Sequence, residues 1–244
     1  MSDSRDLLAE LTQNRPMRRR GIERYHRILD VTEKLLSDSG DEDIGLAQIA
    51  EQAEISLASV YYFFPNRNAV YAALALRFND EIYERSIRPL TDPEPQSWQE
   101  LLDMKHKAAA EFQNSRPAAL RLFLGAGVSA AVRSADFIGN ARLARSRARM
   151  FEAYFDIQNM PDLPHWLEMS AAAMDGIWSL SYGYHGVITE EYRAEATACA
   201  VTYLRRFLPE YLTRIPVTQA SLDRIRIELD MPSPTAGLGL RRPR

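Results

Sequence analysis

The stretch that decides the fold is Leu46-Ala-Gln-Ile-Ala-Glu-Gln-Ala-Glu-Ile-Ser-Leu-Ala-Ser-Val-Tyr-Tyr-Phe-Phe-Pro-Asn-Arg67. Leu46, Ile49 and Ala53 recur at the spacing that places side chains on one face of a helix. Ser56 is suited to cap a second helix, and Pro65 stops that helix because proline cannot donate the next helical hydrogen bond. The stretch therefore predicts two short helices around a tight turn, and a helix-turn-helix that reads DNA is the natural hypothesis.

Four features in and just after this stretch stand in one register: Ile49-Ala50, Ala53-Glu54-Ile55-Ser56, Tyr61-Tyr62-Phe63-Phe64-Pro65-Asn66-Arg67 and Val70. They resemble the TetR family of bacterial transcriptional regulators, whose signature reads Ile-Ala … Ala-Gly-Val-Ser … Tyr-x-x-Phe-Pro-x-Lys … Leu. The resemblance covers roughly residues 20–72. It implies an all-α protein, with an N-terminal three-helix domain that contains the helix-turn-helix, followed by a helical ligand-binding and dimerisation domain.

Three positions depart from the family pattern. Glu54 stands where the turn usually has glycine, and a left-handed backbone there would cost a non-glycine residue about 1–2 kcal/mol. Gly45 replaces the threonine that usually caps the first helix of the motif and touches a phosphate. Arg67 replaces lysine, which keeps the charge but not the geometry.

The composition limits the kinds of protein that this sequence can encode. The chain has 244 residues, 46% of them hydrophobic and 26% charged, with a net charge of −3, so any DNA affinity must come from where the charge sits. A lone Cys199 cannot form an intramolecular disulfide. No apolar run approaches the ~20 residues of a membrane span, and the N-terminus lacks a signal-peptide core. The sequence thus predicts a soluble cytoplasmic protein with no membrane partner.

Residues 1–17 are mostly polar and are expected to form a flexible arm. Arg18, Arg19 and Arg20 follow at the start of the next helix. Arginines placed there could contact DNA phosphates and release counterions. A solvated helix face is the alternative interpretation, and the motif that follows directly favours the phosphate contact.

Four regions follow from the pattern along the chain: the arm at 1–17, the DNA-binding domain at 18–72, a helical ligand-binding and dimerisation domain at 73–215, and a largely flexible tail at 216–244. A proline-rich connection at 89–97 is the clearest interruption between helices. The tail holds one short predicted helix, Ala220–Leu229. No strands or internal repeats are expected.

The last two long helices, at about 165–185 and 190–212, favour a homodimer. The first is apolar nearly all round, with Trp166, Ile177 and Leu180 on one side and Met174 and Trp178 on another. A helix that is apolar on both sides must be buried on both sides. Two such helices from each of two subunits would form a four-helix interface, which the TetR resemblance also implies.

The recognition helix is expected to run from about Ser56 to Phe64, with its first residues in the major groove. Leu57 and Ala58 cannot form bidentate hydrogen bonds, so apolar contact with thymine methyl groups is the expected readout. The resemblance implies phosphate contacts from positions 59, 61 and 67. A single recognition helix reads few base pairs, so specific binding would need a dimer on a palindromic double-stranded operator. The predicted DNA-binding residues are Arg18, Arg19, Arg20, Ser56, Leu57, Ala58, Ser59, Tyr61, Tyr62 and Arg67.

The second domain is expected to sense a small-molecule effector and thereby release DNA. Asp175 lies in an apolar stretch where a carboxylate is costly to bury without a partner. It could pair across the dimer or anchor a polar ligand group, and the sequence leaves both roles open. The other candidates could also be ordinary core residues. The predicted pocket residues are Phe112, Phe123, Phe151, Tyr154, Trp166, Met169, Asp175, Trp178 and Tyr182.

Two other classes of function compete with a ligand-responsive repressor. His165 and Glu168 have a spacing compatible with metal ligation, but they lack further ligands at matching spacing, and no catalytic motif accompanies them. The expectation is therefore no enzyme, no metal and no cofactor. The other alternative is an interaction or architectural protein of the same fold that has lost specific operator recognition, as Gly45, Glu54 and the apolar Leu57-Ala58 pair allow.

Overall fold

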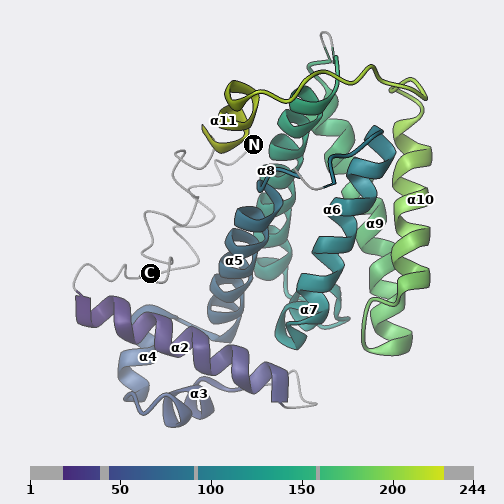
Figure 1. Ribbon diagram of the computed structural model, residues 1–244. Coiled ribbons are helices and arrows are strands. Elements are labelled where there is room, and N and C mark those ends of the chain that lie inside the picture. The colour runs from purple at the N-terminus through teal and green to yellow at the C-terminus, as the bar shows by residue number, and fades with distance from the viewer. Residues whose placement is uncertain (1–18, 39–43, 91–92, 158–159, 228–244) are drawn as a thin grey trace. The chain divides into compact units, whose positions relative to one another are not determined.

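A computed structural model describes residues 19–38, 44–90, 93–157 and 160–227 (Figure 1). Every named element in these ranges is a helix, and the pairing between Phe155 and Arg214 is an isolated antiparallel bridge. The all-α prediction is confirmed. The predicted arm, Arg18 and residues 228–244 of the predicted tail lie outside the described residues. No helix in the described ranges combines the length and apolarity that a membrane crossing needs.

The described residues form two compact units. The N-terminal unit contains those up to Asp80 together with Arg116–Ile138, and the C-terminal unit contains those of Glu81–Ser115 and Gly139–Met231. This division differs from the predicted domains, because residues 116–138 group with the N-terminal helices. The predicted boundary between residues 72 and 73 remains a prediction.

The N-terminal unit is built around α2 (Arg19–Asp38), α3 (Leu46–Gln52) and α4 (Leu57–Phe63). The first part of α5 (Arg67–Ser86), all of α7 (Pro117–Leu124) and the first part of α8 (Ala130–Tyr154) complete it. In Figure 1, α2 lies across α3 and α4.

An aromatic group joins α2 to α4. Tyr25 of α2 is buried, and its ring lies 5.9 Å from that of Phe63 and 4.9 Å from that of Phe64. Burial raises the pKa of the Tyr25 hydroxyl above its ordinary value, so it stays neutral. This core sets the position of α4 against α2.

The C-terminal unit contains α6 (Trp98–Asn114), α9 (Leu163–His185), α10 (Glu190–Leu204) and α11 (Gln219–Ile227), with the remaining parts of α5 and α8. Helices α6, α9 and α10 run side by side in Figure 1. Ser97 and Thr189 cap α6 and α10 with side-chain oxygens, and α9 ends at Gly186 in the left-handed conformation.

Two helices of this unit differ from their predicted ranges. The last long helix stops at Leu204, not near Leu212 as predicted, because Pro209 cannot continue a helix and disfavours helical backbone before it. The short helix in the predicted tail is present as α11, and its Ile225 is buried. Ile225 packs into the core of the C-terminal unit.

The core of the C-terminal unit gathers large side chains from several helices. Trp98 of α6 and Phe151 of α8 are fully buried, with ring centroids 6.4 Å apart. The Trp98 indole nitrogen donates to the Pro209 carbonyl at 3.0 Å, which ties the segment after α10 to α6. Such burial contributes about 1.5–3 kcal/mol for each large apolar side chain.

A buried lysine makes the stability of this unit depend on pH. The Lys105 ammonium donates to the carbonyls of Ser86 and Arg88 at 2.8 and 2.9 Å. Burial, helped by the nearby Arg147 charge, lowers the pKa of Lys105 from 10.5 to about 7. Between these values the unfolded chain binds more protons than the folded one, so stability rises with pH.

We expect the free energy of unfolding to rise by about 2 kcal/mol between pH 7 and pH 9, measured by urea unfolding. Lys105→Met should remove most of this rise. Lys107→Met alters an exposed lysine of the same helix and should leave it intact. Equal pH dependence in both variants would contradict the assignment to Lys105.

Candidate nucleic-acid interface and candidate ligand site

Helices α3 and α4 form the predicted helix-turn-helix. Ile49 of α3 and Ala53 at its end are buried, and so are Val60 and Phe63 of α4. The Ser56 hydroxyl accepts from the backbone amide of Ser59 at 3.3 Å, which confirms the predicted cap of α4. Gly45 precedes α3 and supplies no side-chain cap, as a glycine must.

The turn between the helices places Glu54 at φ 52°, in the left-handed region. This conformation favours glycine, because a Cβ atom crowds the backbone there. The Glu54 carboxylate pairs with Arg27 of α2, but both side chains are largely exposed and the pair contributes little. The sequence pattern identified this position correctly as a site of backbone strain.

We expect Glu54→Gly to stabilise the protein by about 1 kcal/mol in urea unfolding, because it removes the Cβ atom from a left-handed residue. Glu54→Ala removes the same carboxylate and keeps the Cβ atom, so it should give no gain. Equal stability of the two variants would mean that the backbone at this turn is not strained.

The outer face of α4 carries most of the predicted base-reading and phosphate-contacting residues. Ser56, Leu57 and Ala58 are exposed at its start, and Tyr61 and Tyr62 are 50% and 54% exposed along it. Ser59 is half-buried, with its hydroxyl 2.8 Å from that of Ser56. This face carries no charged side chain, so its available chemistry is apolar contact and hydroxyl hydrogen bonding.

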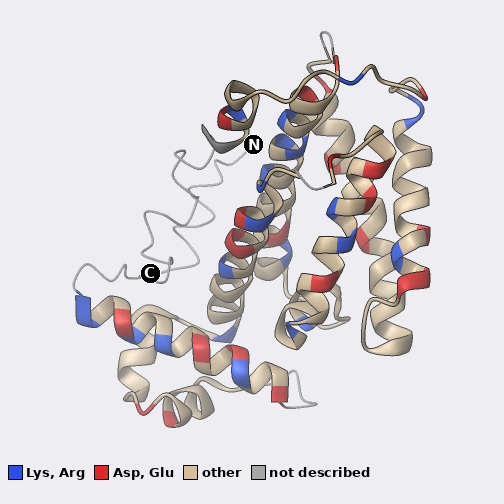
Figure 2. Cartoon of the chain, viewed as in Figure 1, with Lys and Arg blue, Asp and Glu red and all other residues tan. Residues whose placement is uncertain are grey.

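Charged residues flank this face. Arg67 is half-buried at the start of α5, which Asn66 caps by accepting from the amide of Ala69 at 3.0 Å. Arg19 and Arg20 are exposed at the start of α2, where acidic and basic residues alternate (Figure 2). Arg19 pairs with Glu23 at 3.0 Å, so part of the predicted positive patch is offset by acids.

An ion cluster in the N-terminal unit was not predicted from the sequence. Arg77 of α5 is 4% exposed and donates to Asp30 at 2.7 Å and to Glu33 at 2.6 Å, both on α2. Arg116 donates to the other Glu33 oxygen at 2.7 Å. The cluster links α2 to α5 and to the residue before α7. A signal for it was present, since Arg77 is a lone charge within an apolar helical run.

Comparison with known proteins identifies this arrangement. The sequence profile described as "Bacterial regulatory proteins, tetR family" matches residues 28–74, which include the whole helix-turn-helix. The helix-turn-helix region of the chain is therefore similar to the TetR family. The resemblance inferred from the signature residues is confirmed.

The match to a curated relative also covers only part of each protein. A protein of Xanthobacter autotrophicus, described as an "Uncharacterized HTH-type transcriptional regulator in dhlA 5'region", is 32% identical over 71 residues. The match covers 29% of this chain and only 33% of that protein's length. The likeness is therefore to a single domain, and it shows nothing about the ligand of either protein.

Solved structures extend the comparison of the TetR fold to most of the chain. A TetR-family transcriptional regulator from Streptomyces coelicolor superimposes with a TM-score of 0.60 at 22% identity, over 76% of this chain and 99% of that one. One from Rhodococcus sp. RHA1 gives 0.58 at 14%, over 76% and 97%. At these identities the likeness shows the fold alone.

The predicted pocket residues are divided between the two compact units. Phe123 belongs to the N-terminal unit and the others to the C-terminal unit. Phe151 and Tyr154 are fully buried core residues, and the Tyr154 hydroxyl is engaged with the backbone of Leu90 at 2.8 and 2.9 Å. Trp166 stacks on Phe207, with ring centroids 4.4 Å apart.

The remaining predicted pocket residues divide by exposure. Met169 is 48% exposed and Tyr182 is partly exposed, whereas Phe112 and Trp178 are buried. A groove between α6 and α10, lined by Asp103, Thr197 and Val201 among others, contains none of the predicted set. Their role in ligand binding stays a prediction.

Asp175 has a partner within its own chain. Its Oδ2 accepts from the Asn140 side-chain amide of α8 at 3.0 Å. Its charge also acts on Arg147, a buried residue of α8 whose pKa falls to about 10 because burial outweighs the attraction of Asp175. From the sequence, either a partner subunit or a ligand was expected to pair with Asp175. The structure shows this further contact within the chain.

Arg147 and Asp175 belong to an interior polar cluster that also contains His106 of α6 and Trp178 of α9. The His106 and Trp178 rings meet edge to face at 6.5 Å, and both residues are fully buried. Burial, with the charges of Arg147 and Arg193, lowers the pKa of His106 well below its ordinary value, so the ring is neutral. Two buried groups, His106 Nε2 and Trp178 Nε1, have no hydrogen-bond partner among the described residues.

These two groups are costly to leave unsatisfied. The Thr197 hydroxyl lies 3.1 Å from the Arg193 carbonyl and 3.0 Å from His106 Nδ1. When the hydroxyl donates to the carbonyl, the His106 proton is on Nδ1. His106 Nε2 then carries a lone pair and Trp178 Nε1 carries a proton. The cluster thus contains one unsatisfied acceptor and one unsatisfied donor, together with the charge of Arg147.

The predicted metal-ligating spacing has no structural support. His165 is exposed at the start of α9 and Glu168 is half-buried. Among the described residues, no three His, Cys, Asp or Glu side chains gather closely enough to hold a metal ion.

Proposed function

We propose that this chain is a ligand-responsive transcriptional repressor that binds a palindromic DNA operator as a homodimer and is released by a small molecule. The observation that carries the proposal is the exposed outer face of α4, with Leu57, Tyr61 and Tyr62 presented on a fully formed helix-turn-helix. Its place of action would be the cytoplasm, where operator DNA is available.

The chemistry of α4 favours one mode of docking. Leu57 and Ala58 at its exposed start would touch thymine methyl groups in the major groove. The Tyr61 hydroxyl and the Arg67 guanidinium would bind backbone phosphates and fix the register. Because so few groups read bases, a single subunit would discriminate weakly, and two half-sites would be required.

The outward face of α9 supports the proposed dimer. Met169, Leu180 and Tyr184 are 48%, 53% and 71% exposed at helical spacing, and small residues lie between them. A Cβ atom built on Gly176 or Gly183 would meet nothing within 4 Å, so packing within the described chain does not require glycine there. Small residues on an outward apolar stripe suit the close approach of a partner helix.

We expect the protein to sediment as a dimer at micromolar concentration and Leu180→Arg to sediment as a monomer, because the new charge would be desolvated at the interface. Tyr211→Arg is the matched control, since Tyr211 is 88% exposed and lies beyond α10. A monomeric wild type, or a dimeric Leu180→Arg variant, would remove α9 from the interface.

The interior polar cluster supports the proposed ligand response. An effector that supplies a donor to His106 Nε2 and an acceptor to Trp178 Nε1 would satisfy both groups. Release of DNA requires only that effector and DNA prefer different conformations of the dimer.

The proposal is tested by fluorescence anisotropy with the DNA upstream of the protein's own gene and a scrambled control, at two salt concentrations. Preferential binding that survives moderate salt supports a specific regulator. The apolar Leu57-Ala58 pair keeps one alternative, an architectural protein without operator recognition. Equal, salt-sensitive binding to both DNAs, followed by no enrichment in selection from random DNA, would favour that alternative.

A further inference from the structure

The turn of the helix-turn-helix contains an acid that folding stability does not explain. Glu54 has a left-handed backbone, with φ 52°, which favours glycine over any residue with a Cβ atom. Its carboxylate pairs with the Arg27 guanidinium of α2, but the two side chains are 79% and 51% exposed, so the pair adds little to stability. A strained residue without a stabilising contact points to a functional role.

The ion pair lies close to the start of the recognition helix. Glu54 comes two residues before Ser56, the cap of α4, and both Ser56 and Leu57 are exposed there. A guanidinium paired with Glu54 is therefore near the end of α4 that is proposed to enter the major groove. Phosphates border this groove, and an arginine near it can bind them.

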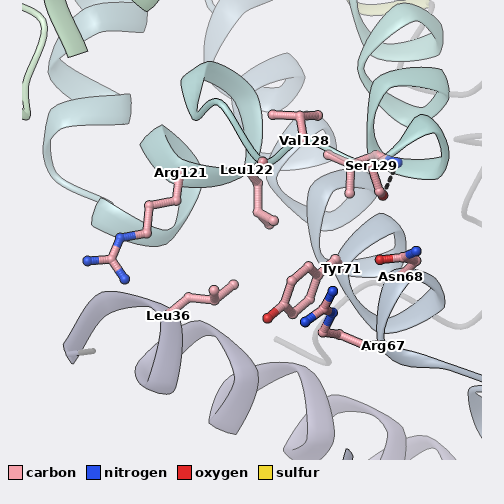
Figure 3. Close-up of a pocket in the computed structure, with 10 residues that line it drawn as sticks. Leu36, Arg67, Asn68, Tyr71, Arg121, Leu122, Val128 and Ser129 are labelled. Carbon is pink, nitrogen blue, oxygen red and sulfur yellow. Dashed lines mark hydrogen bonds between the residues drawn. The ribbon is translucent and has the colours of Figure 1, made fainter. Parts of the chain in front are cut away.

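A second arginine follows the other end of α4. Arg67 begins α5, shortly after Phe63 ends α4. With Tyr71 and Arg121 it contributes to the wall of a pocket of about 310 Å³, where its guanidinium lies 5.8 Å from the centre of the Tyr71 ring (Figure 3). Arg27 and Arg67 thus flank the recognition helix at its start and its end, within one compact unit.

The other arginines of α2 differ from Arg27 in their partners. Arg19 pairs with Glu23 of its own helix. Arg20 and Arg24 are exposed, and their side chains form no ion pair among the described residues. Arg27 differs from all three because its carboxylate partner belongs to the helix-turn-helix itself. The acid of the turn therefore neutralises a cation of the proposed DNA interface.

We infer that Glu54 limits the affinity of this protein for DNA, because its carboxylate keeps the Arg27 guanidinium from the phosphates beside α4. The inference rests on the proposed docking of α4. Phosphates are the same along every DNA sequence, so the carboxylate should lower the affinity for all sequences by the same factor. Glu54 would then set the strength of DNA binding and not its sequence preference.

Glu54→Gln tests the inference, because it removes the charge but keeps the Cβ atom and the left-handed backbone. We expect this variant to bind both the upstream DNA and the scrambled control roughly fivefold more tightly than the wild type, measured by fluorescence anisotropy. One added phosphate contact should also make the slope of log K against log salt steeper by about 0.9. A gain confined to one of the two DNAs would contradict a phosphate contact.

Glu51→Gln is the matched control. Glu51 is an exposed acid of α3, and its carboxylate forms no ion pair among the residues that the structure describes. This substitution removes the same charge from the same motif without freeing an arginine, so it should tighten DNA binding by less than about twofold. Unchanged DNA affinity in Glu54→Gln, or an equal gain in the two variants, would overturn the inference.

A double-mutant cycle separates the release of Arg27 from direct repulsion between Glu54 and phosphate. In an Arg27→Gln background no guanidinium is freed, so adding Glu54→Gln should give a clearly smaller gain. An equal gain in both backgrounds would overturn the role of Arg27. If the wild type binds no DNA, the proposed function fails and this inference falls with it. If the wild type binds DNA and Glu54→Gln binds no better, the inference alone fails.

Discussion

The double variant Tyr61→Phe with Arg67→Ala is expected to bind every DNA sequence about 100-fold more weakly than the wild type. Each substitution removes a hydrogen bond to a charged phosphate, and such bonds contribute about 1.5–3 kcal/mol. Both side chains are accessible, with Tyr61 exposed on α4 and Arg67 half-buried at the start of α5. The measurement is fluorescence anisotropy with specific and scrambled DNA.

The salt dependence provides a second readout of the same variant. Loss of the Arg67 phosphate contact should reduce the slope of log K against log salt by about 0.9. Arg145→Ala removes an equal charge from an exposed position on α8 and should change neither affinity nor slope. Unchanged DNA affinity in the double variant would remove the proposed docking of α4.

Glu33→Gln is expected to lower the free energy of unfolding by about 3 kcal/mol, the cost of breaking a buried ion pair. Glu33 is the shared partner of Arg77 and Arg116, at 2.6 and 2.7 Å, and Arg77 is almost completely buried. A neutral amide would leave the buried Arg77 charge paired with the Asp30 carboxylate. Urea unfolding measures the effect.

Asp30→Asn is the matched control for this cluster. Asp30 also pairs with Arg77, at 2.7 Å, but its side chain is 43% exposed and water can replace it. We therefore expect a clearly smaller loss than for Glu33→Gln. Equal losses would mean that the shared contact with Arg116 and the deeper burial of Glu33 do not matter.

Local rules were sufficient for the helix-turn-helix. The Ser56 cap and the stop at Pro65 follow from backbone hydrogen bonding, and the strained turn at Glu54 follows from the steric cost of a Cβ atom. Each depends on residues within a few positions of one another. The same local reasoning failed at the end of α10, because the predicted helix extended past Pro209 to about Leu212.

Longer-range features of the candidate sites could not be predicted in the same way. The partner of Asp175 is Asn140, on a different helix, and nothing in the apolar pattern of α9 indicates it. The predicted pocket residues were chosen for being large and apolar, a property that core residues such as Phe151 share. Hydrophobicity predicts burial, but it does not predict where packing leaves a space.

The sequence by itself determined the all-α class, the helix-turn-helix and the outward residues of α4, because periodicity, caps and turn residues act over a few neighbouring positions. Only the tertiary structure decided that residues 116–138 join the N-terminal unit. Only it brought Arg116 to Glu33, and Arg121 and Arg67 to one pocket. These pairings arise when helices distant in sequence pack together, since the free energy of packing belongs to the complementary surfaces of both helices and not to either segment alone.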